Sequence, residues 1–297
     1  MRLAVTGKQG QVVTSLLERG AAASVEVIAL GRPELDLADP ASVKAAIAAA
    51  APDVVVSAAA YTAVDKAESE PELAFEVNEV GAGAVAEAAA MLQVPIIHLS
   101  TDYVFAGDKA DPYLESDPTG PVSVYGASKL AGEKKVAAAT GNHAILRTAW
   151  VYSPFGANFL KTMLRLGASR DMLRVVADQR GTPTSALDIA DAVITVARRL
   201  KTDPDPALRG VFHLTGGGEG TWADFAEVIF ASLEARTGRG VAVERITTAD
   251  YPTPARRPAN SRLSNNKLQS SYGVKLADWD VSTRSVVDRL LAAGQAI

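Results

Sequence analysis

The chain has 297 residues, with 30 basic side chains, 34 acidic side chains and a formal net charge of -4. This length suits about two domains. Charges of both signs are interspersed, which excludes the basic stripe typical of nucleic-acid-binding proteins. Cysteine is absent, so a disulfide framework and a thiolate metal site are also excluded. The longest Ala-rich tract is broken by Pro52, and no basic and apolar leader precedes the first expected strand, so we expect a cytoplasmic protein outside the membrane.

Short apolar runs alternate with amphipathic segments in the first half of the chain. We expect buried strands at residues 3–5, 25–30, 54–57, 96–100 and 144–147. One helix should begin with Asp39 as N-cap and Pro40 in its first turn, and should end before Pro52. Another should run from about Glu72 to Leu92. This alternation predicts an α/β fold with a parallel sheet covered on both faces, in which ligands bind at the carboxyl ends of the strands.

After Arg147 the pattern becomes less regular. We expect a loop over 150–156, a helix to about residue 166, and then a strand near Val175 and a helix over 186–199 that return to the sheet. The remainder holds a glycine-rich turn at 216–218, a helix from about Trp222, a Pro- and Arg-rich loop over 251–262, and a last helix after Ser282. We therefore expect residues 1–150 and about 174–200 to form one domain, and about 151–173 and 201–297 to form a smaller C-terminal substrate-binding lobe.

A glycine-rich turn, Thr6-Gly7-Lys8-Gln9-Gly10, follows the first expected strand. Gly7 and Gly10 would let the backbone approach a pyrophosphate, which the positive end of the following helix attracts. The third position of this spacing is Val13 instead of glycine, so the helix and the strand must move apart or repack there. Alone, such a turn also fits an ordinary strand-to-helix connection.

Arg32 closes the second expected strand, where an acidic residue would bind the ribose of NAD. An arginine is suited instead to the 2'-phosphate of NADPH, and the alternative is an ordinary solvated loop arginine. Asp36 and Leu37 follow at a spacing suited to flanking the adenine. Three small residues after the third strand would admit a cofactor, or would simply allow tight helix packing: Ala58, Ala59 and Ala60.

The most informative motif is Tyr125-Gly-Ala-Ser-Lys129. A Tyr and a Lys four residues apart share one face of a helix. The ammonium of Lys129 can then lower the pKa of Tyr125 from its usual value of about 10 and make it a usable proton donor. Thr101, at the end of the fourth strand, could hydrogen-bond the substrate oxygen that gains charge. Each feature alone is common, and together with the glycine turn they predict a nicotinamide enzyme that reduces a carbonyl.

Segments along nearly the whole chain resemble the dTDP-4-dehydrorhamnose reductase family, which belongs to the extended short-chain dehydrogenase/reductase group. Two strings are family-specific, YTAVDKAE at 61–68 and STDYVF at 100–105. The other similar segments are residues 6–12, 52–60, 124–133, 147–152, 158–166 and 257–263.

The resemblance implies a Rossmann-type doubly wound parallel sheet with a nucleotide-sugar-binding lobe. It implies reduction of the 4-keto group of dTDP-4-dehydro-L-rhamnose by NADPH, or sometimes NADH, in the last step of dTDP-L-rhamnose synthesis. Tyr125 would donate the proton, Lys129 would hold the nicotinamide ribose and acidify Tyr125, and Thr101 would orient the ketone. The implied cofactor contacts are Gly7, Lys8, Gln9, Gly10, Gln11, Val12, Arg32, Asp36, Leu37, Ala58, Ala59, Ala60, Tyr61, Tyr125 and Lys129. The implied substrate contacts are Thr101, Asp102, Tyr103, Trp150, Asn158, Arg257, Asn260 and Arg262.

Some positions depart from the family pattern. Besides Val13, Ser57 replaces the usual Asn before the alanines, and Ser264 stands where Asp often follows Arg-Leu. Family members are often associated with magnesium, in some cases at a dimer contact built from glutamates. Near the first helix we find Ser15 and Glu18 but no carboxylate cluster, so Mg²⁺ receives no assigned site and a homodimer stays open.

Two alternatives to the reductase also stay open. One is a nucleotide-sugar dehydratase or epimerase of the same group, although a dehydratase typically carries Asp-Glu after the Thr and here Tyr103 follows Asp102. The other is a non-catalytic subunit that binds NADP(H), since a fold does not determine a function. Such relatives often lose the Tyr, the Lys or the substrate loops, and this chain keeps them.

Overall fold

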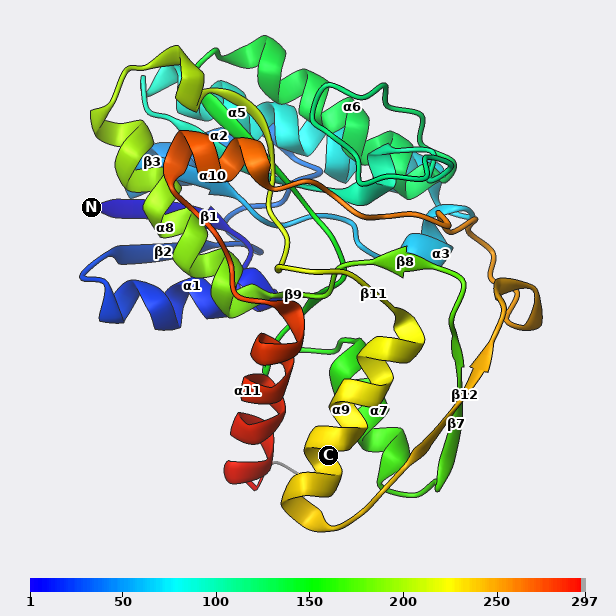
Figure 1. Cartoon of the computed structure of the whole chain (residues 1–297). Helices are drawn as coiled ribbons and strands as arrows, with labels where there is room; N and C mark the ends of the chain where they lie inside the picture. Colours follow the sequence, from blue (N-terminus) through cyan, green and yellow to red (C-terminus); the bar gives the residue numbers. More distant parts are fainter. Residues whose placement is uncertain (295–297) are drawn as a thin grey trace.

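The central feature of the computed structural model, which describes residues 1–294, is a sheet of six parallel strands. Their order is β10-β5-β4-β3-β1-β2, so the strand order reverses at β1 (Figure 1). The strands are β1 (Arg2–Thr6), β2 (Glu26–Leu30), β3 (Val54–Ser57), β4 (Ile96–Thr101), β5 (His143–Thr148) and β10 (Gly210–His213). Each strand predicted before residue 150 is confirmed; β3 and β4 are buried along their whole length, whereas β2 at the edge of the sheet is only half-buried.

Helices cover both faces of this sheet. One face packs against α1 (Gln11–Ala22), α8 (Ala186–Thr202) and α10 (Asn266–Tyr272). The other face packs against α2 (Pro40–Ala50), α5 (Ala82–Met91) and α6 (Val124–Ala139). The chain therefore has the Rossmann-type doubly wound α/β fold that was predicted.

The ends of α2 follow its sequence signals. The Asp39 carboxylate accepts a hydrogen bond from the Ala41 amide at 3.0 Å, and Pro40 occupies the first turn. The last helical residue is Ala50. Ala51 is the C-cap, with a φ of +42°, and stands directly before Pro52. The predicted boundaries are confirmed.

The helix predicted over residues 72–92 forms with an interruption. A π-helical turn, η1 (Glu76–Gly81), separates α4 (Pro71–Phe75) from α5. Asn78 in this turn accepts a hydrogen bond from the Tyr61 amide at 2.8 Å and donates one to the Ser128 hydroxyl at 3.0 Å. The turn therefore links the segment after β3 to α6.

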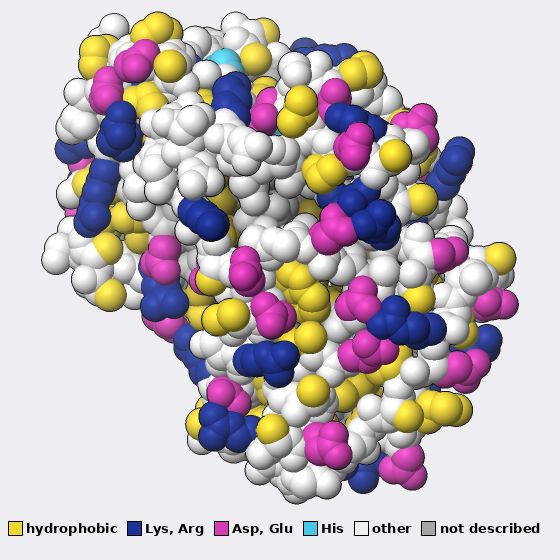
Figure 2. Space-filling view, in the orientation of Figure 1, with side chains coloured by type: hydrophobic (Ala, Val, Ile, Leu, Met, Phe, Trp, Pro, Cys, Tyr) yellow, Lys and Arg dark blue, Asp and Glu magenta, His cyan; other side chains and the backbone are white. Residues whose placement is uncertain are grey.

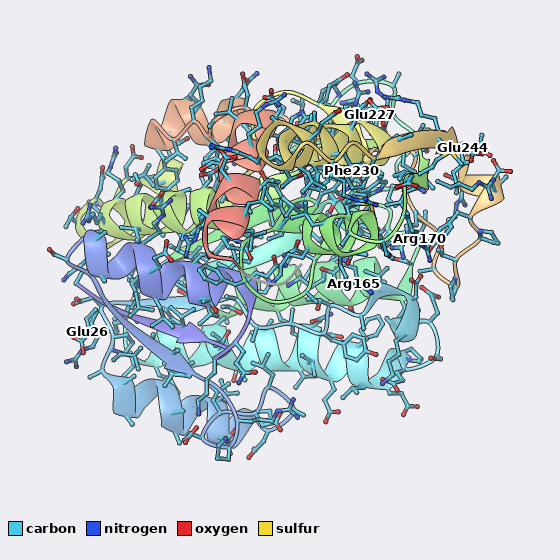
Figure 3. The ribbon with its side chains drawn as sticks, turned by 90° about the horizontal axis from the view of Figure 1, so that it is seen from below. Glu26, Arg165, Arg170, Glu227, Phe230 and Glu244 are labelled. Atoms are coloured by element: carbon cyan, nitrogen blue, oxygen red, sulfur yellow. The ribbon has the colours of Figure 1, made fainter. Side chains whose placement is uncertain are left out.

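A second hydrophobic core lies below the sheet in Figure 1 and forms a lobe. Phe230, labelled in Figure 3, is buried in this core. The lobe contains α7 (Phe159–Gly167), α9 (Trp222–Thr237), α11 (Trp279–Ala292), β7 (Met172–Val176) and β12 (Ala242–Ile246). The shorter elements of the chain are α3 (Val64–Ala67), β6 (Val151–Tyr152), β8 (Arg180–Gly181), β9 (Thr184–Ser185), β11 (Gly220–Thr221), η2 (Asp102–Val104), η3 (Pro206–Leu208) and η4 (Thr248–Asp250).

Some predictions for the second half need correction. The strand near Val175 exists as β7, but it pairs with β12 and not with the central sheet. Its burial alternates along the chain, which is typical of a strand with one exposed face and unlike the fully buried β3 and β4. Conversely, β10 belongs to the central sheet although we assigned residues 201–297 to the lobe. The last helix begins at Trp279, before Ser282. The division into a dinucleotide-binding domain and a nucleotide-sugar-binding lobe stays a prediction.

One face of the molecule carries both charges without separation. Figure 2 shows acidic and basic side chains interspersed on the face toward the viewer. Within residues 1–294, none of the helices is both long enough and apolar enough to cross a bilayer.

Candidate active site

The turn after β1 has the shape that its glycines predict. Gly7 has a φ of +102°, and a Cβ on it would lie 3.2 Å from the Val13 side chain and 3.4 Å from that of Ala59. Gly10 is the N-cap of α1, and no side chain caps the first amides of the helix, which leaves an N-terminus of the kind that suits an anion. Val13 is buried in the core, so the turn accommodates it by packing and not by separation.

Lys8 and Arg32 lie together beside this turn. Lys8 is exposed and donates to the Arg32 carbonyl oxygen at 3.1 Å and to the Glu34 carboxylate. Arg32 is exposed after β2, as is Gln9 in the turn itself. Two basic side chains at one edge suit a phosphate on the adenosine ribose.

Asp36 and Leu37 have roles in the fold. The Asp36 carboxylate accepts a hydrogen bond from the Ala38 amide at 3.1 Å, and Leu37 is buried against α2 and α5. The predicted contact of both residues with adenine is not tested by these interactions and stays a prediction.

The alanines after β3 meet the glycine turn. The amides of Ala58 and Ala59 both donate to the Thr6 hydroxyl at 3.0 Å, which joins the ends of β1 and β3. Ala58, Ala59 and Ala60 are half-buried. Tyr61 follows and donates its hydroxyl to Glu70 at 2.8 Å. These small residues therefore lie at the reversal of strand order, where doubly wound folds bind their ligands.

Gln11 and Asn158 connect the turn to the lobe. The Gln11 side-chain oxygen accepts hydrogen bonds from Ser153 at 2.9 Å and from Asn158 at 3.0 Å. Asn158 also caps α7 by accepting from the Lys161 amide at 3.1 Å. Val12, next to Gln11, is half-buried against the main core. Asn158 therefore has a structural role, and its contact with substrate stays a prediction.

Tyr125 lies at the start of α6 beside the end of β4. Its ring meets that of Tyr103 edge to face, with centroids 5.6 Å apart at an angle of 75°. The Ser123 hydroxyl caps the helix by accepting from the Gly126 amide at 3.2 Å. The Tyr125 phenol lies close enough to the hydroxyl of Thr101, the last residue of β4, for that hydroxyl to act on its pKa.

Lys129 lies one turn further along α6 and is buried. Its Nζ donates to the Leu99 carbonyl oxygen at 2.7 Å, two residues before Thr101. The structure therefore brings Thr101, Tyr125 and Lys129 together at the carboxyl end of β4, as their predicted roles require.

The pKa of Tyr125 differs in direction from the sequence prediction. Burial raises the pKa of this phenol above its usual value, and the hydrogen bond with Thr101 opposes the rise only in part. The prediction that Lys129 lowers the pKa of Tyr125 is therefore wrong here, because burial raises this pKa and the neighbouring charge of Asp102 raises it further. A phenol with a raised pKa is fully protonated at neutral pH but is a weaker acid than an exposed tyrosine, so burial alone does not prepare Tyr125 for proton donation.

Asp102 is a buried carboxylic acid next to Thr101. Its Oδ1 accepts a hydrogen bond from the Thr101 hydroxyl at 2.9 Å. Burial raises the pKa of Asp102 to about 6, although hydrogen bonds with Ser261 and Thr101 oppose this. The carboxylate therefore orients the Thr101 hydroxyl around neutral pH.

The Pro- and Arg-rich loop reaches this site through Arg257. Its guanidinium donates to the Tyr103 hydroxyl at 3.0 Å and to the Asp65 carboxylate at 2.7 Å. It therefore lies near the predicted sugar-binding residues.

Asn260 and Arg262 are buried in the same loop. Asn260 donates to the Lys109 carbonyl oxygen at 2.7 Å and accepts from Arg262 at 2.8 Å. Arg262 also forms an ion pair with Glu219 at 2.6 Å. These bonds fit a role in holding the loop better than a direct contact with substrate, which stays a prediction for both residues.

Trp150 lies where the sheet meets the lobe. It has a φ of +48°, and its indole stacks on that of Trp222 with centroids 3.7 Å apart. Its predicted place in the substrate site is consistent with this position between the two cores.

Sequence reasoning missed a buried ion pair beneath Lys129. Glu133 and Arg147 approach to 2.7 Å, and each side chain is only 5% exposed. The spacing of Lys129 and Glu133 on α6 could have placed Glu133 beside Lys129, because residues four apart share a helix face, but no local signal points to Arg147 on β5.

The structure offers no support for magnesium. Among residues 1–294 there is no group of three or more His, Cys, Asp or Glu side chains placed to hold a metal ion. Glu18, near the first helix, instead forms two hydrogen bonds of 2.7 Å with Arg289.

Comparisons with known proteins agree on one family. Residues 1–292 match the family model described as the RmlD substrate binding domain. The chain is 57% identical over 295 residues to a dTDP-4-dehydrorhamnose reductase of Sinorhizobium fredii, with 99% of each chain covered. It is similar to the crystal structure of a dTDP-4-dehydrorhamnose reductase from Clostridium acetobutylicum, with a TM-score of 0.90, 38% identity, and coverage of 98% of this chain and 100% of that one. It is also similar to one from Bacillus anthracis in complex with NADP, with a TM-score of 0.88, 32% identity, and coverage of 98% and 99%.

Proposed function

Since this chain belongs to the dTDP-4-dehydrorhamnose reductase family, we propose that it is the enzyme that reduces the 4-keto group of dTDP-4-dehydro-L-rhamnose with NADPH. The observation that carries this proposal is the meeting of Thr101, Tyr125 and Lys129 at the carboxyl end of β4. This is the edge of the sheet to which the glycine turn and the alanines also belong.

The turn after β1 fits the pyrophosphate of a dinucleotide. Gly7 has a positive φ that other residues rarely adopt, and no side chain caps the first amides of α1 at Gly10. Lys8 and Arg32 would bind the 2'-phosphate, and the small residues 58–60 would line the cofactor. When bound, reduced nicotinamide supplies the hydride.

The protein's own groups handle the proton and the substrate oxygen. Tyr125 would transfer its phenolic proton to the oxygen of the former ketone, and Thr101 would donate to the same oxygen after its single hydroxyl proton turns away from Asp102. Lys129, as an ammonium, would hold the nicotinamide ribose. Four side chains would surround the sugar: Asp102, Tyr103, Trp150 and Arg257. Arg257 donates to the Tyr103 hydroxyl and would also bind a phosphate of the substrate.

The alternatives make different predictions. A dehydratase needs a second carboxylate after Asp102, where this chain has Tyr103, whose hydroxyl bonds Arg257. A binding subunit would bind NADPH without turnover. The test is loss of NADPH absorbance when dTDP-4-dehydro-L-rhamnose is added, with an assay lacking the sugar as control. Binding of NADPH without any oxidation would reject the reductase and favour the binding subunit.

The preference for NADPH should depend on Arg32. Changing Arg32→Ala is expected to raise the KM for NADPH roughly tenfold or more, because a hydrogen bond to a charged group contributes about 1.5–3 kcal/mol. The KM for NADH should change little. Arg174→Ala is a matched control, since Arg174 is an exposed arginine of β7 that pairs with Glu244 at 3.3 Å. Equal effects on both cofactors would rule out a contact with the 2'-phosphate.

A further inference from the structure

Consecutive residues of β4 hold successive turns of α6. Thr101 bonds Tyr125, the Leu99 carbonyl oxygen accepts from Lys129 at 2.7 Å, and the Ser100 hydroxyl donates to Glu133 at 2.5 Å. Glu133 therefore has the same kind of anchor as the two residues assigned to catalysis. It lies one turn beyond Lys129 on the same face of the helix.

Arg147 completes this arrangement from β5. It lies opposite Ser100 in the sheet and donates two hydrogen bonds to Glu133, at 2.9 and 2.7 Å. Its guanidinium also lies over the Phe105 ring, 5.0 Å from the centroid. Arginine keeps its proton at any accessible pH, so Glu133 has a permanent cationic partner.

A buried ion pair seldom increases stability, because apolar side chains of similar volume often serve as well. The buried Glu133–Arg147 pair therefore needs an explanation other than stability. We propose that the Glu133–Arg147 pair is a positioning unit for Lys129, which keeps its amine in place and in the ammonium form that holds the cofactor. This inference rests on the proposed function.

Among the acidic groups near Lys129, Glu133 is the one whose charge raises the pKa of the Lys129 amine. Burial lowers the pKa of Lys129 to about 8, and the charge of Glu133 opposes this. Burial and then Lys129 lower the pKa of His98, on β4, well below its usual value, so that imidazole stays neutral. Asp102 is engaged with Thr101, and the raised pKa of Tyr125 keeps its phenol neutral.

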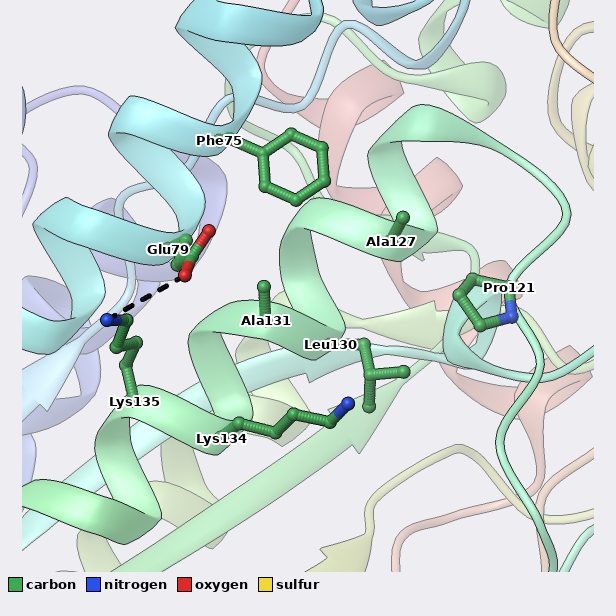
Figure 4. A pocket seen from close by; sticks show the side chains of 8 residues that line it. All are labelled: Phe75, Glu79, Pro121, Ala127, Leu130, Ala131, Lys134 and Lys135. Atoms are coloured by element: carbon green, nitrogen blue, oxygen red, sulfur yellow. Dashed lines mark ion pairs between the residues drawn. The ribbon is translucent and has the colours of Figure 1, made fainter.

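The other charged side chains near α6 do not face Lys129. Glu79 of η1 faces Lys135 at 3.9 Å on the outer face of α6, beside a cavity of about 360 Å³ lined by Phe75, Leu130 and Ala131 (Figure 4). The remaining charged or titratable side chains on elements packed against α6 are exposed or bonded to other residues: Asp65, Lys66, Glu68, Glu72, Glu76, Glu87 and His143.

The test is the pH dependence of NADPH binding, followed by fluorescence between about pH 6 and pH 10. In the unmodified enzyme, affinity should fall above about pH 8, as Lys129 loses its proton. Glu133→Gln should move this loss to lower pH by about one unit, because an opposite charge nearby stabilises the ammonium. Glu133→Asp keeps the charge and should restore the original pH dependence. Glu79→Gln, on the outer face of the same helix, should change nothing.

Glu133→Gln leaves Arg147 buried without its partner, so this variant could fail to fold. The double variant Glu133→Gln with Arg147→Met removes both charges and should show a smaller downward shift, because the cation that disfavours the Lys129 ammonium is lost as well. If either of these two variants folded and kept the original pH dependence of NADPH binding, the proposal would be overturned. It would also be overturned if neither variant folded, because the ion pair would then have a purely structural role. NADPH binding needs no sugar, so an enzyme that binds NADPH but does not oxidise it would contradict the proposed function without affecting this test.

Discussion

Changing Tyr125→Phe is expected to lower kcat for ketone reduction by roughly 10²–10⁴-fold, the usual effect of losing a general acid. The substitution removes only the hydroxyl that bonds Thr101 and would donate the proton. The ring and its edge-to-face contact with Tyr103 remain, so folding and NADPH affinity should stay close to those of the unmodified enzyme. The measurement is single-turnover NADPH oxidation together with NADPH binding by fluorescence.

A second tyrosine provides the control. Tyr251 is 62% exposed, and Tyr251→Phe should leave kcat unchanged. If Tyr125→Phe retained a kcat close to that of the unmodified enzyme, Tyr125 could not be the proton donor, and Asp102, the other acid beside Thr101, would become the candidate.

Changing Gly132→Ala is expected to destabilise the protein by about 1–3 kcal/mol, the usual cost of overpacking a core. In an open helix the same change stabilises by about 0.4–1 kcal/mol. Here a Cβ would overlap the Asn78 carbonyl oxygen of η1, which is backbone and cannot rotate away. The cost of this overlap exceeds the gain in helix stability, so the melting temperature should fall. Each kcal/mol of destabilisation corresponds to roughly 2–4 °C in a large domain.

Activity of Gly132→Ala should fall as well, because α6 carries Tyr125 and Lys129 and small displacements of reacting groups slow catalysis strongly. Gly83→Ala on the neighbouring α5 is the matched control, since its Cβ would lie 3.2 Å from the Lys135 Cβ, a tight contact but much milder than overlap with a backbone oxygen. Its melting temperature should fall much less than that of Gly132→Ala. Equal melting temperatures for both variants would mean that α6 can move away from η1 without loss.

Local patterns were sufficient for much of this fold. The strands before residue 150 are continuous apolar runs, and α2 is bounded by Asp39, Pro40 and Pro52. The spacing of Tyr125 and Lys129 placed both on one helix. Such features depend on residues close together in sequence, so no knowledge of distant contacts is needed.

Other properties depend on partners far away along the chain. Only the tertiary structure decided that β7 pairs with β12, that β10 joins the central sheet, and that Asn260 and Arg262 bond the loop itself. It also brought Arg147 to Glu133 and reversed the expected pKa shift of Tyr125. The physical reason is the same in each case: strand partners, ion pairs and loss of hydration arise when distant segments pack, and the residue types alone do not specify which segments meet.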